Sequence, residues 1–295
     1  MAVVTLLALA GCSTEAAAPG GRIIAVGAEN QYTSVISQIG GRYVDATSVM
    51  SNPNTDPHTF EASAQVAATI SAAALVVQNG LGYDSFMTKI ESASPSSGRT
   101  VITAQKVLGL PDSTQNPHLW YSPTTMPAVA RSIAAALSSK EPSHRAYFAS
   151  NLAKFDASLG KWTAAIAAFK AAHPSVPVAT TEPVADYLLE AAGTRNLTPW
   201  ALQAAIMNDT DPAPQDVAIQ NDLFTGGRVK VFLYNQQVTD SITANYLKLA
   251  QKNHVPVVGV YETMPTDGYN YQSWMEAELA ALDRAVTAGT STERL

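Results

Sequence analysis

The chain has 295 residues, a formal net charge of −6 and a hydrophobic fraction of 46%. At roughly 100–200 residues per domain, this length predicts one large or two medium domains. The negative charge and the lack of a basic patch argue against binding to nucleic acid. The single cysteine, Cys12, excludes a disulfide framework and any cysteine-based metal site. Beyond the N-terminal segment no run of apolar residues is long enough to span a membrane as a helix.

The N-terminal segment has the pattern of a bacterial lipoprotein signal. Residues 3–10 are almost entirely apolar, and residues 9–12 read Leu-Ala-Gly-Cys, the motif at which a signal is cut before a lipid-bearing cysteine. We therefore expect lipidation of Cys12, a signal and tether over residues 1–21, and an extracytoplasmic chain anchored to the cell membrane. No Lys or Arg precedes the apolar run, which a start codon placed too late or a shortened chain would explain. The alternative to a lipoprotein signal is a slightly apolar terminus with an incidental cysteine.

The first half of the chain alternates short β-rich runs with helical patterns. The predicted strands cover residues 22–28, 46–50, 75–79 and 100–103, and the predicted helices cover residues 31–40 and 63–74. This alternation is typical of βαβ units that build a parallel sheet.

The middle of the chain carries the most regular helical pattern. Seven apolar residues alternate steps of four and three positions, at Phe148, Leu152, Phe155, Leu159, Trp162, Ile166 and Phe169. The pattern predicts a helix over residues 143–173, roughly 45 Å long at 1.5 Å per residue. A coiled coil is the alternative, but a single stretch of this length between two α/β halves fits a connecting helix better.

The βαβ rhythm resumes after the connecting helix. The predicted strands cover residues 176–181, 229–234 and 256–261, and the predicted helices cover residues 183–192, 241–253 and 271–286. We therefore predict an α/β protein of two lobes, residues 22–142 and 174–295. Each lobe is a mainly parallel sheet flanked by helices, and the one long connecting helix joins them.

Two of the five histidines share one local sequence pattern. His58 and His118 each follow a proline, and an aromatic residue lies two positions further on. Proline fixes its own φ and restricts the residue before it, so each histidine leaves a stiff loop in a defined direction. The residues before the prolines, Asp56 and Asn116, either orient these histidines as outer-shell partners or only favour the turn.

Two glutamates, Glu182 and Glu262, follow predicted strands of the second half. Ligands collect at the carboxyl ends of parallel strands, so two facing lobes could bring both glutamates to the two histidines. Two imidazoles with two carboxylates suit Mn²⁺, Fe²⁺ or Zn²⁺ and suit Cu(I) and Ca²⁺ poorly. Each of these residues also has an explanation without a metal: the histidines could be surface residues, Glu182 could be an acidic helix start, and Glu262 could be a solvated acid. Asp267 is a rival for the position of the fourth ligand.

Several segments together resemble the metal-binding lipoproteins of bacterial manganese/zinc ABC importers, the cluster A-I solute-binding proteins. The resemblance spans residues 22–286 and depends on these segments: 56–61 (DPHTFE), 116–123 (NPHLWYSP), 181–183 (TEP) with Tyr187, the mid-chain helix, and 271–275 (YQSWM). It implies two α/β lobes joined by a single helix, with the metal bound between them. It also implies that His58 and His118 are the N-lobe ligands and Glu182 the third ligand.

The fourth ligand position departs from the pattern of many relatives. Where they have Thr-Asp-Ser, this chain has Tyr-Glu-Thr-Met-Pro at 261–265, so we expect Glu262, with Asp267 as the rival. Glu182 and the absence of a His-rich insertion lean toward manganese or iron over zinc.

The resemblance implies a monomeric binding protein that captures one Mn²⁺ or Zn²⁺, with Fe²⁺ as a further candidate. Its partners would be an ABC permease and its ATPase, and it would not be an enzyme. The alternative from another class is a metal-dependent hydrolase that uses the same site. An adhesin or a metallochaperone on the same fold is a third possibility.

Overall fold

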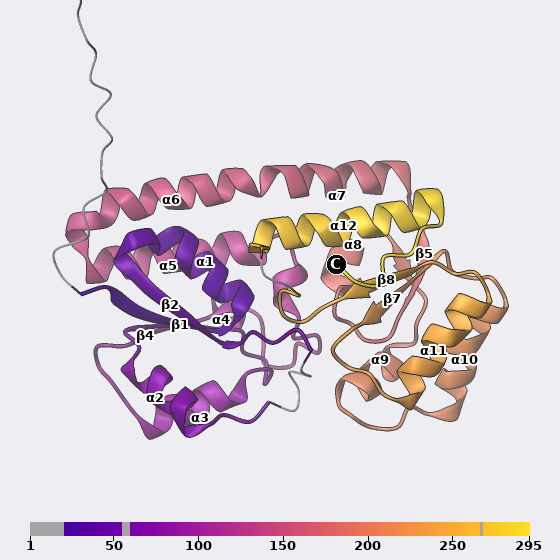
Figure 1. Ribbon diagram of the computed structural model, residues 1–295, viewed down its shortest axis with the longest axis horizontal. Coiled ribbons are helices and arrows are strands. Elements are labelled where there is room, and N and C mark those ends of the chain that lie inside the picture. Colours follow the sequence, from indigo (N-terminus) through magenta and orange to yellow (C-terminus); the bar gives the residue numbers. More distant parts are fainter. Residues whose placement is uncertain (1–20, 55–59, 266–267) are drawn as a thin grey trace, which may run out of the picture.

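A computed structural model describes residues 21–54, 60–265 and 268–295, and shows two parallel sheets joined by a long helical segment (Figure 1). One sheet has the strand order β2-β1-β3-β4 and the other β6-β5-β7-β8, and every strand pair is parallel. We call the unit built on the first sheet the N-lobe and the unit built on the second the C-lobe. The predicted fold class is confirmed.

The N-lobe sheet is covered by helices on both faces. Its strands are β1 (Ile23–Glu29), β2 (Val44–Met50), β3 (Leu75–Gln78) and β4 (Thr100–Thr103). Its helices are α1 (Asn30–Gly40), η1 (Gly41–Tyr43), α2 (Ala64–Ala72), α3 (Ser85–Ala93), α4 (Ala104–Val107), η3 (Leu119–Tyr121) and α5 (Thr125–Lys140). Because β3 is buried along its whole length, its apolar residues run on without the alternation of a half-exposed strand.

The C-lobe repeats this architecture. Its strands are β5 (Pro177–Thr180), β6 (Arg195–Asn196), β7 (Val231–Asn235) and β8 (Val257–Val260). Its helices are α8 (Asp186–Ala191), α9 (Trp200–Met207), α10 (Pro214–Thr225), α11 (Ser241–Lys252) and α12 (Tyr271–Ala288). The C-terminal residues run along the outer side of β8, where Gly259 N–H donates to Thr292 O at 2.8 Å and Thr292 N–H donates to Val257 O at 2.8 Å.

The structure divides the predicted connecting helix of residues 143–173 into three consecutive elements. A short turn, η4 (Pro142–His144), leads into α6 (Arg145–Ser158), and α7 (Gly160–Ala172) follows after one residue, Leu159. Leu159 N–H bonds to Asp156 O, three residues back, which tightens the turn where the next residue is glycine. The two helices remain nearly in line above both lobes (Figure 1).

The helix α12 lies beside α7 and reaches back to the N-lobe (Figure 1). At its N-terminal end Gln272 exchanges hydrogen bonds with Gln38 of α1, at 2.7 and 3.0 Å. One continuous apolar core runs from the N-lobe sheet past Phe148, Trp162 and Trp274 to the C-lobe sheet. The lobes are therefore joined by packed side chains as well as by a covalent connection.

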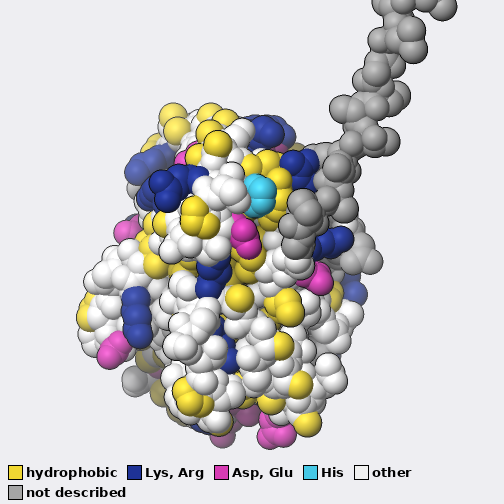
Figure 2. Space-filling model, turned by 90° about the vertical axis from the view of Figure 1, so that its left-hand side faces the viewer, with side chains coloured by type: hydrophobic (Ala, Val, Ile, Leu, Met, Phe, Trp, Pro, Cys, Tyr) yellow, Lys and Arg dark blue, Asp and Glu magenta, His cyan; other side chains and the backbone are white. Residues whose placement is uncertain are grey.

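The surface at the N-lobe end is mixed in character. In Figure 2 the basic side chains on this face lie scattered among acidic, apolar and uncharged polar groups. Such a pattern differs from the continuous basic stripe of nucleic-acid-binding proteins. Within the described residues, no helix combines the length and the apolar character that crossing a bilayer requires.

Candidate metal centre

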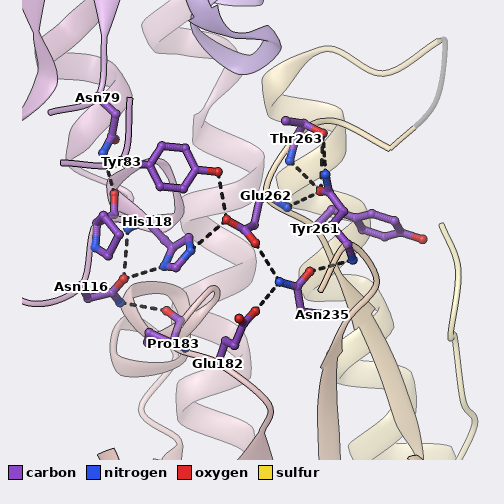
Figure 3. A network of polar contacts seen from close by, with 12 residues as sticks. Asn79, Tyr83, Asn116, His118, Glu182, Pro183, Asn235, Tyr261, Glu262 and Thr263 are labelled. Carbon is purple, nitrogen blue, oxygen red and sulfur yellow. Dashed lines mark hydrogen bonds and ion pairs between the residues drawn. The ribbon is translucent and has the colours of Figure 1, made fainter. Parts of the chain in front are cut away.

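The candidate ligands meet where the strands of both sheets end. Glu182 follows β5, Asn235 is the last residue of β7, and Glu262 follows β8. From the N-lobe side, His118 stands immediately before η3 and Tyr83 lies in the turn between β3 and α3. These side chains point toward one another between the lobes (Figure 3).

His118 is fully buried and its ring is fixed by the residue two positions earlier. Asn116 Oδ1 accepts hydrogen bonds from His118 N at 3.0 Å and from His118 Nδ1 at 2.8 Å. Asn116 Nδ2 in turn donates to Pro183 O of the C-lobe at 2.8 Å. Because Nδ1 carries the proton donated to Asn116, Nε2 is the nitrogen that faces the other candidate ligands (Figure 3).

Glu262 is fully buried and lies at the centre of the cluster. Its Oε2 lies 3.2 Å from His118 Nε2 and accepts a hydrogen bond from the Tyr83 hydroxyl at 2.9 Å. Burial, followed by the charge of Glu262, raises the pKa of Tyr83 well above its usual value. Tyr83 is therefore a stable hydroxyl donor at neutral pH.

Asn235 lies between the two glutamates. Its Nδ2 amide donates to Glu182 Oε2 and, at 2.8 Å, to Glu262 Oε1 (Figure 3). Its Oδ1 accepts a hydrogen bond from Gln237 N at 3.0 Å, which fixes the direction of the amide. All three side chains in this bridge are at most 2% exposed.

Three predicted site residues, Asp56, His58 and Asp267, lie outside the described residues, as does Cys12. Among the described residues, no three His, Cys, Asp or Glu side chains converge as a group that could hold a metal ion. The amide of Asn235 stands between the two carboxylates, and the ring of His118 reaches only one of them. His118, Glu182 and Glu262 are thus brought into one connected network without enclosing a common point.

The N-lobe holds the loop that carries Glu262. Asn30 pairs with the backbone of Met264, accepting from its N–H at 2.8 Å and donating to its C=O at 3.2 Å. Gln31 Nε2 donates to Glu262 O at 3.2 Å. From the C-lobe, Gln237 Oε1 accepts from Glu262 N at 2.7 Å. The loop is therefore tied to both lobes at once.

A second group of buried acids surrounds the site without joining it. Burial raises the pKa of Glu29 well above its usual value, and the neighbouring Asp84 adds to the effect. Burial also raises the pKa of Asp84 to about 6, against hydrogen bonds from the backbone N–H groups of Gly80 and Asn79. On α12, burial raises the pKa of Glu278 to about 8.

Asn235, Tyr83 and Gln237 were not among the site residues predicted from the sequence. The signal for Asn235 was present, because it directly follows the strand predicted over residues 229–234, and the rule that selected Glu182 and Glu262 applies to it equally. Tyr83 offered no such signal, since it reaches Glu262 only through a turn whose path the sequence does not specify.

Comparison with known proteins identifies the family of this chain. A family model described as the zinc-uptake complex component A, periplasmic (ZnuA), matches residues 26–285. The manganese-binding lipoprotein MntA of Bacillus subtilis is 24% identical over 268 residues, which cover 85% of this chain and 84% of the relative.

Two solved structures share the fold. The periplasmic zinc-binding protein TroA of Treponema pallidum superposes with a TM-score of 0.75 at 17% identity, covering 92% of this chain and 100% of TroA. The solute-binding protein FpvC of Pseudomonas aeruginosa, solved with Mn²⁺, has a TM-score of 0.73 at 21% identity, covering 90% and 99% of the two chains.

The predicted family is confirmed, and the hydrolase alternative finds no support in these comparisons. Because the family model covers most of the chain, from the first strand to the last helix, the protein belongs to the ZnuA family of periplasmic metal-binding proteins, which serve bacterial ABC importers.

Proposed function

We propose that the protein captures one Mn²⁺ or Zn²⁺ ion between its lobes and delivers it to an ABC permease without catalysing a reaction. His118, Glu182 and Glu262 supply ligands, and His58 supplies the fourth. The main support is the buried His118–Glu262–Asn235–Glu182 network, which links loops of both lobes. Two carboxylates would balance the charge of a dication, so that its burial costs less.

Capture requires a rearrangement within this network. A metal ion would take the place of the hydrogen bonds that Asn235 makes to the two carboxylates, and it would separate His118 Nε2 from Glu262 Oε2. Asn116 already directs His118 Nε2 toward the site, so the ring needs no reorientation. The carboxylates would then turn from the amide toward the ion.

The proposed ligands define a class of divalent metal ions and do not single out one ion. Imidazole and carboxylate ligands accept Mn²⁺, Fe²⁺ and Zn²⁺, and zinc exceeds manganese in intrinsic affinity at most such sites. The B. subtilis relative is named for manganese and the T. pallidum protein for zinc. Manganese retained against an equal concentration of zinc would identify a site built for manganese.

The test is equilibrium dialysis of the metal-free protein against Mn²⁺ and, separately, Zn²⁺. We expect about one ion per chain, and His118→Ala should lower the affinity by about 100-fold or more because a direct ligand is lost. His173→Ala is the matched control, since His173 directly follows α7 and its Nε2 lies 3.5 Å from Asp283 Oδ1 on α12. No bound metal in the unmodified protein would overturn the proposal.

We further propose that the protein is a monomer and is held at the membrane by lipid on Cys12. The support is the Leu-Ala-Gly-Cys motif at residues 9–12 and the lipoprotein name of the B. subtilis relative. Cys12→Ser should move the protein from the membrane fraction to the soluble extracytoplasmic fraction. Retention of the variant in washed membranes would contradict lipidation at this residue.

A further inference from the structure

A buried acid on α12 is connected to both ligand loops through one tyrosine. Glu278 is 2% exposed, and its Oε1 accepts from Trp274 Nε1 at 3.0 Å and lies 3.1 Å from the Tyr121 hydroxyl. The same hydroxyl lies 2.8 Å from Tyr261 O and 3.3 Å from Tyr261 N. Tyr121 thus contacts one acid side chain and both backbone polar groups of Tyr261.

The number of available hydrogens shows that Glu278 must be protonated if it is hydrogen-bonded to Tyr121. Tyr121 has a single hydroxyl hydrogen and two oxygen neighbours, Tyr261 O and Glu278 Oε1. The hydrogen belongs to the shorter contact, the one with Tyr261 O. The contact with Glu278 is then a hydrogen bond only if Glu278 carries a proton and donates it to the tyrosine oxygen. With that proton every contact has one donor and one acceptor.

Tyr121 contacts the loops of two candidate ligands, His118 and Glu262. Tyr121 N–H donates to His118 O at 3.3 Å, closing the turn that begins at His118. Tyr261 precedes Glu262 directly, and its backbone is held by the Tyr121 hydroxyl. A shift of this hydroxyl would therefore move the loop of His118 relative to the loop of Glu262.

We propose that Glu278, as a neutral acid, is a positioning residue for the metal site: it orients Tyr121, and Tyr121 fixes the spacing between His118 and Glu262. This inference rests on the proposed function, because it assumes that both residues bind the metal. It assigns a role to a buried acid that the ligand set does not use.

Ionisation of Glu278 would oppose this arrangement. A carboxylate would compete with Tyr261 O for the one hydrogen of Tyr121 and weaken the bond that holds the Glu262 loop. The titratable groups that face Glu278 are Tyr121 and Tyr261, and the charge of Glu262 acts on Tyr121 from the other side. Burial raises the pKa of Glu278 to about 8, so the neutral acid predominates at pH 7.

The experiment measures Mn²⁺ affinity under argon at pH 7.0 and 8.8 for the unmodified protein, Glu278→Gln, Glu278→Leu and Tyr121→Phe. With its amide nitrogen in the place of Oε1, Gln can donate to Tyr121 without ionising, although that nitrogen cannot also accept from Trp274. Glu278→Gln should therefore bind more tightly than Glu278→Leu, and equally well at both pH values. Glu278→Leu and Tyr121→Phe should each bind about tenfold more weakly, as is typical when an outer-shell partner is removed. The unmodified protein should lose affinity relative to Glu278→Gln as the pH rises.

A double variant and a control separate positioning from general damage to the fold. The double variant Glu278→Leu/Tyr121→Phe should bind no more weakly than Tyr121→Phe alone, because both substitutions break the same connection from Glu278 through Tyr121 to Tyr261. Glu276→Gln is the control on the same helix, since Glu276 is partly exposed and pairs with Lys161. Its affinity should equal that of the unmodified protein.

The outcomes distinguish this inference from the proposed function. Metal binding by the unmodified protein together with normal binding by Glu278→Leu would overturn the positioning role alone. Weak binding by Glu278→Gln at pH 7.0, equal to that of Glu278→Leu, would also overturn it. Absence of metal binding in the unmodified protein would overturn the proposed function and this inference with it.

Discussion

Asn235 is a neutral residue that keeps two buried acids in one place. Its Nδ2 donates to Glu182 and Glu262, which would otherwise face each other without a shared donor. If both carboxylates bind the metal ion as proposed, the amide bridge holds them close to each other before the ion arrives. The ion would then replace the two hydrogen bonds of the amide.

Replacing Asn235 by Ala should destabilise the metal-free protein more than the metal-loaded protein. The loss of donors to buried carboxylates costs about 1–3 kcal/mol when the site is empty, whereas a bound dication would satisfy the same oxygens. The measurement is thermal unfolding with and without Mn²⁺. We expect a larger metal-induced rise in Tm for Asn235→Ala than for the unmodified protein.

Asn208→Ala is the control for this prediction, because the Asn208 side chain is exposed and makes a local contact instead, donating from Nδ2 to Ala204 O of its own helix. Equal shifts in Tm for the unmodified protein and Asn235→Ala would show that the amide does not respond to the metal.

Gly160, at the junction of α6 and α7, has room for a larger side chain. A Cβ added at Gly160 would have no neighbour within 4 Å, and the residue begins α7. Alanine restricts the unfolded chain more than glycine and favours the helix, so Gly160→Ala should raise the free energy of unfolding by about 0.5–1 kcal/mol. Urea unfolding monitored by circular dichroism measures the difference.

At Gly259, in contrast to Gly160, the structure leaves no room for a Cβ atom. A Cβ there would lie 2.0 Å from the backbone oxygen of Glu293, which runs beside β8. Gly259→Ala should therefore lower the free energy of unfolding. A stabilised Gly259→Ala, or a destabilised Gly160→Ala, would contradict this explanation of the two glycines.

At this scale the sequence predicted the apolar seam of the connecting segment. The seam from Phe148 to Phe169 is largely buried and faces the core, as its spacing predicts. The interruption at Leu159 was not predicted, because the apolar repeat passes through it unchanged. The helices α3, α5, α9 and α10 were also missed. In α5 an apolar spacing was overlooked, that of Met126, Val129, Ile133 and Leu137. In α9 and α10 most non-buried positions carry small or polar residues, which show little periodic contrast.

For the site, the sequence predicted the loops better than their contacts. Pro-His loops and acids after strands are local signals, and they led to His118, Glu182 and Glu262. The contacts of the residues that connect these candidate ligands, such as Tyr83 and Tyr121, depend on which loops of the two lobes face each other. These contacts form between segments far apart in the chain, so no local sequence pattern predicts them.

The whole molecule should be more stable at mildly acidic than at alkaline pH. Burial raises the pKa of Asp84 to about 6, of Asp186 to about 6 and of Glu278 to about 8, from ordinary values of 3.8, 3.8 and 4.5. Between the ordinary and the raised pKa the folded state holds a proton that the unfolded state has released. The free energy of unfolding therefore falls as the pH rises, by about 1.4 kcal/mol per pH unit for each such group.

Urea unfolding of the metal-free protein at pH 5.5 and pH 8 tests this dependence. We expect a lower midpoint at pH 8, and a smaller difference for Glu278→Gln, which cannot ionise. A midpoint that rises from pH 5.5 to pH 8 would contradict the raised pKa values.

The C-terminal residues that lie beside β8 should protect the protein from self-association in concentrated solution. An open edge strand offers unpaired N–H and C=O groups to any other chain, and β8 would be such an edge of the C-lobe sheet. The bonds of Gly259 and Val257 to Thr292 occupy that edge from within the molecule. Removal of the last few residues would uncover a wholly buried apolar strand, Val257–Val260, and so favour self-association through β-sheet extension.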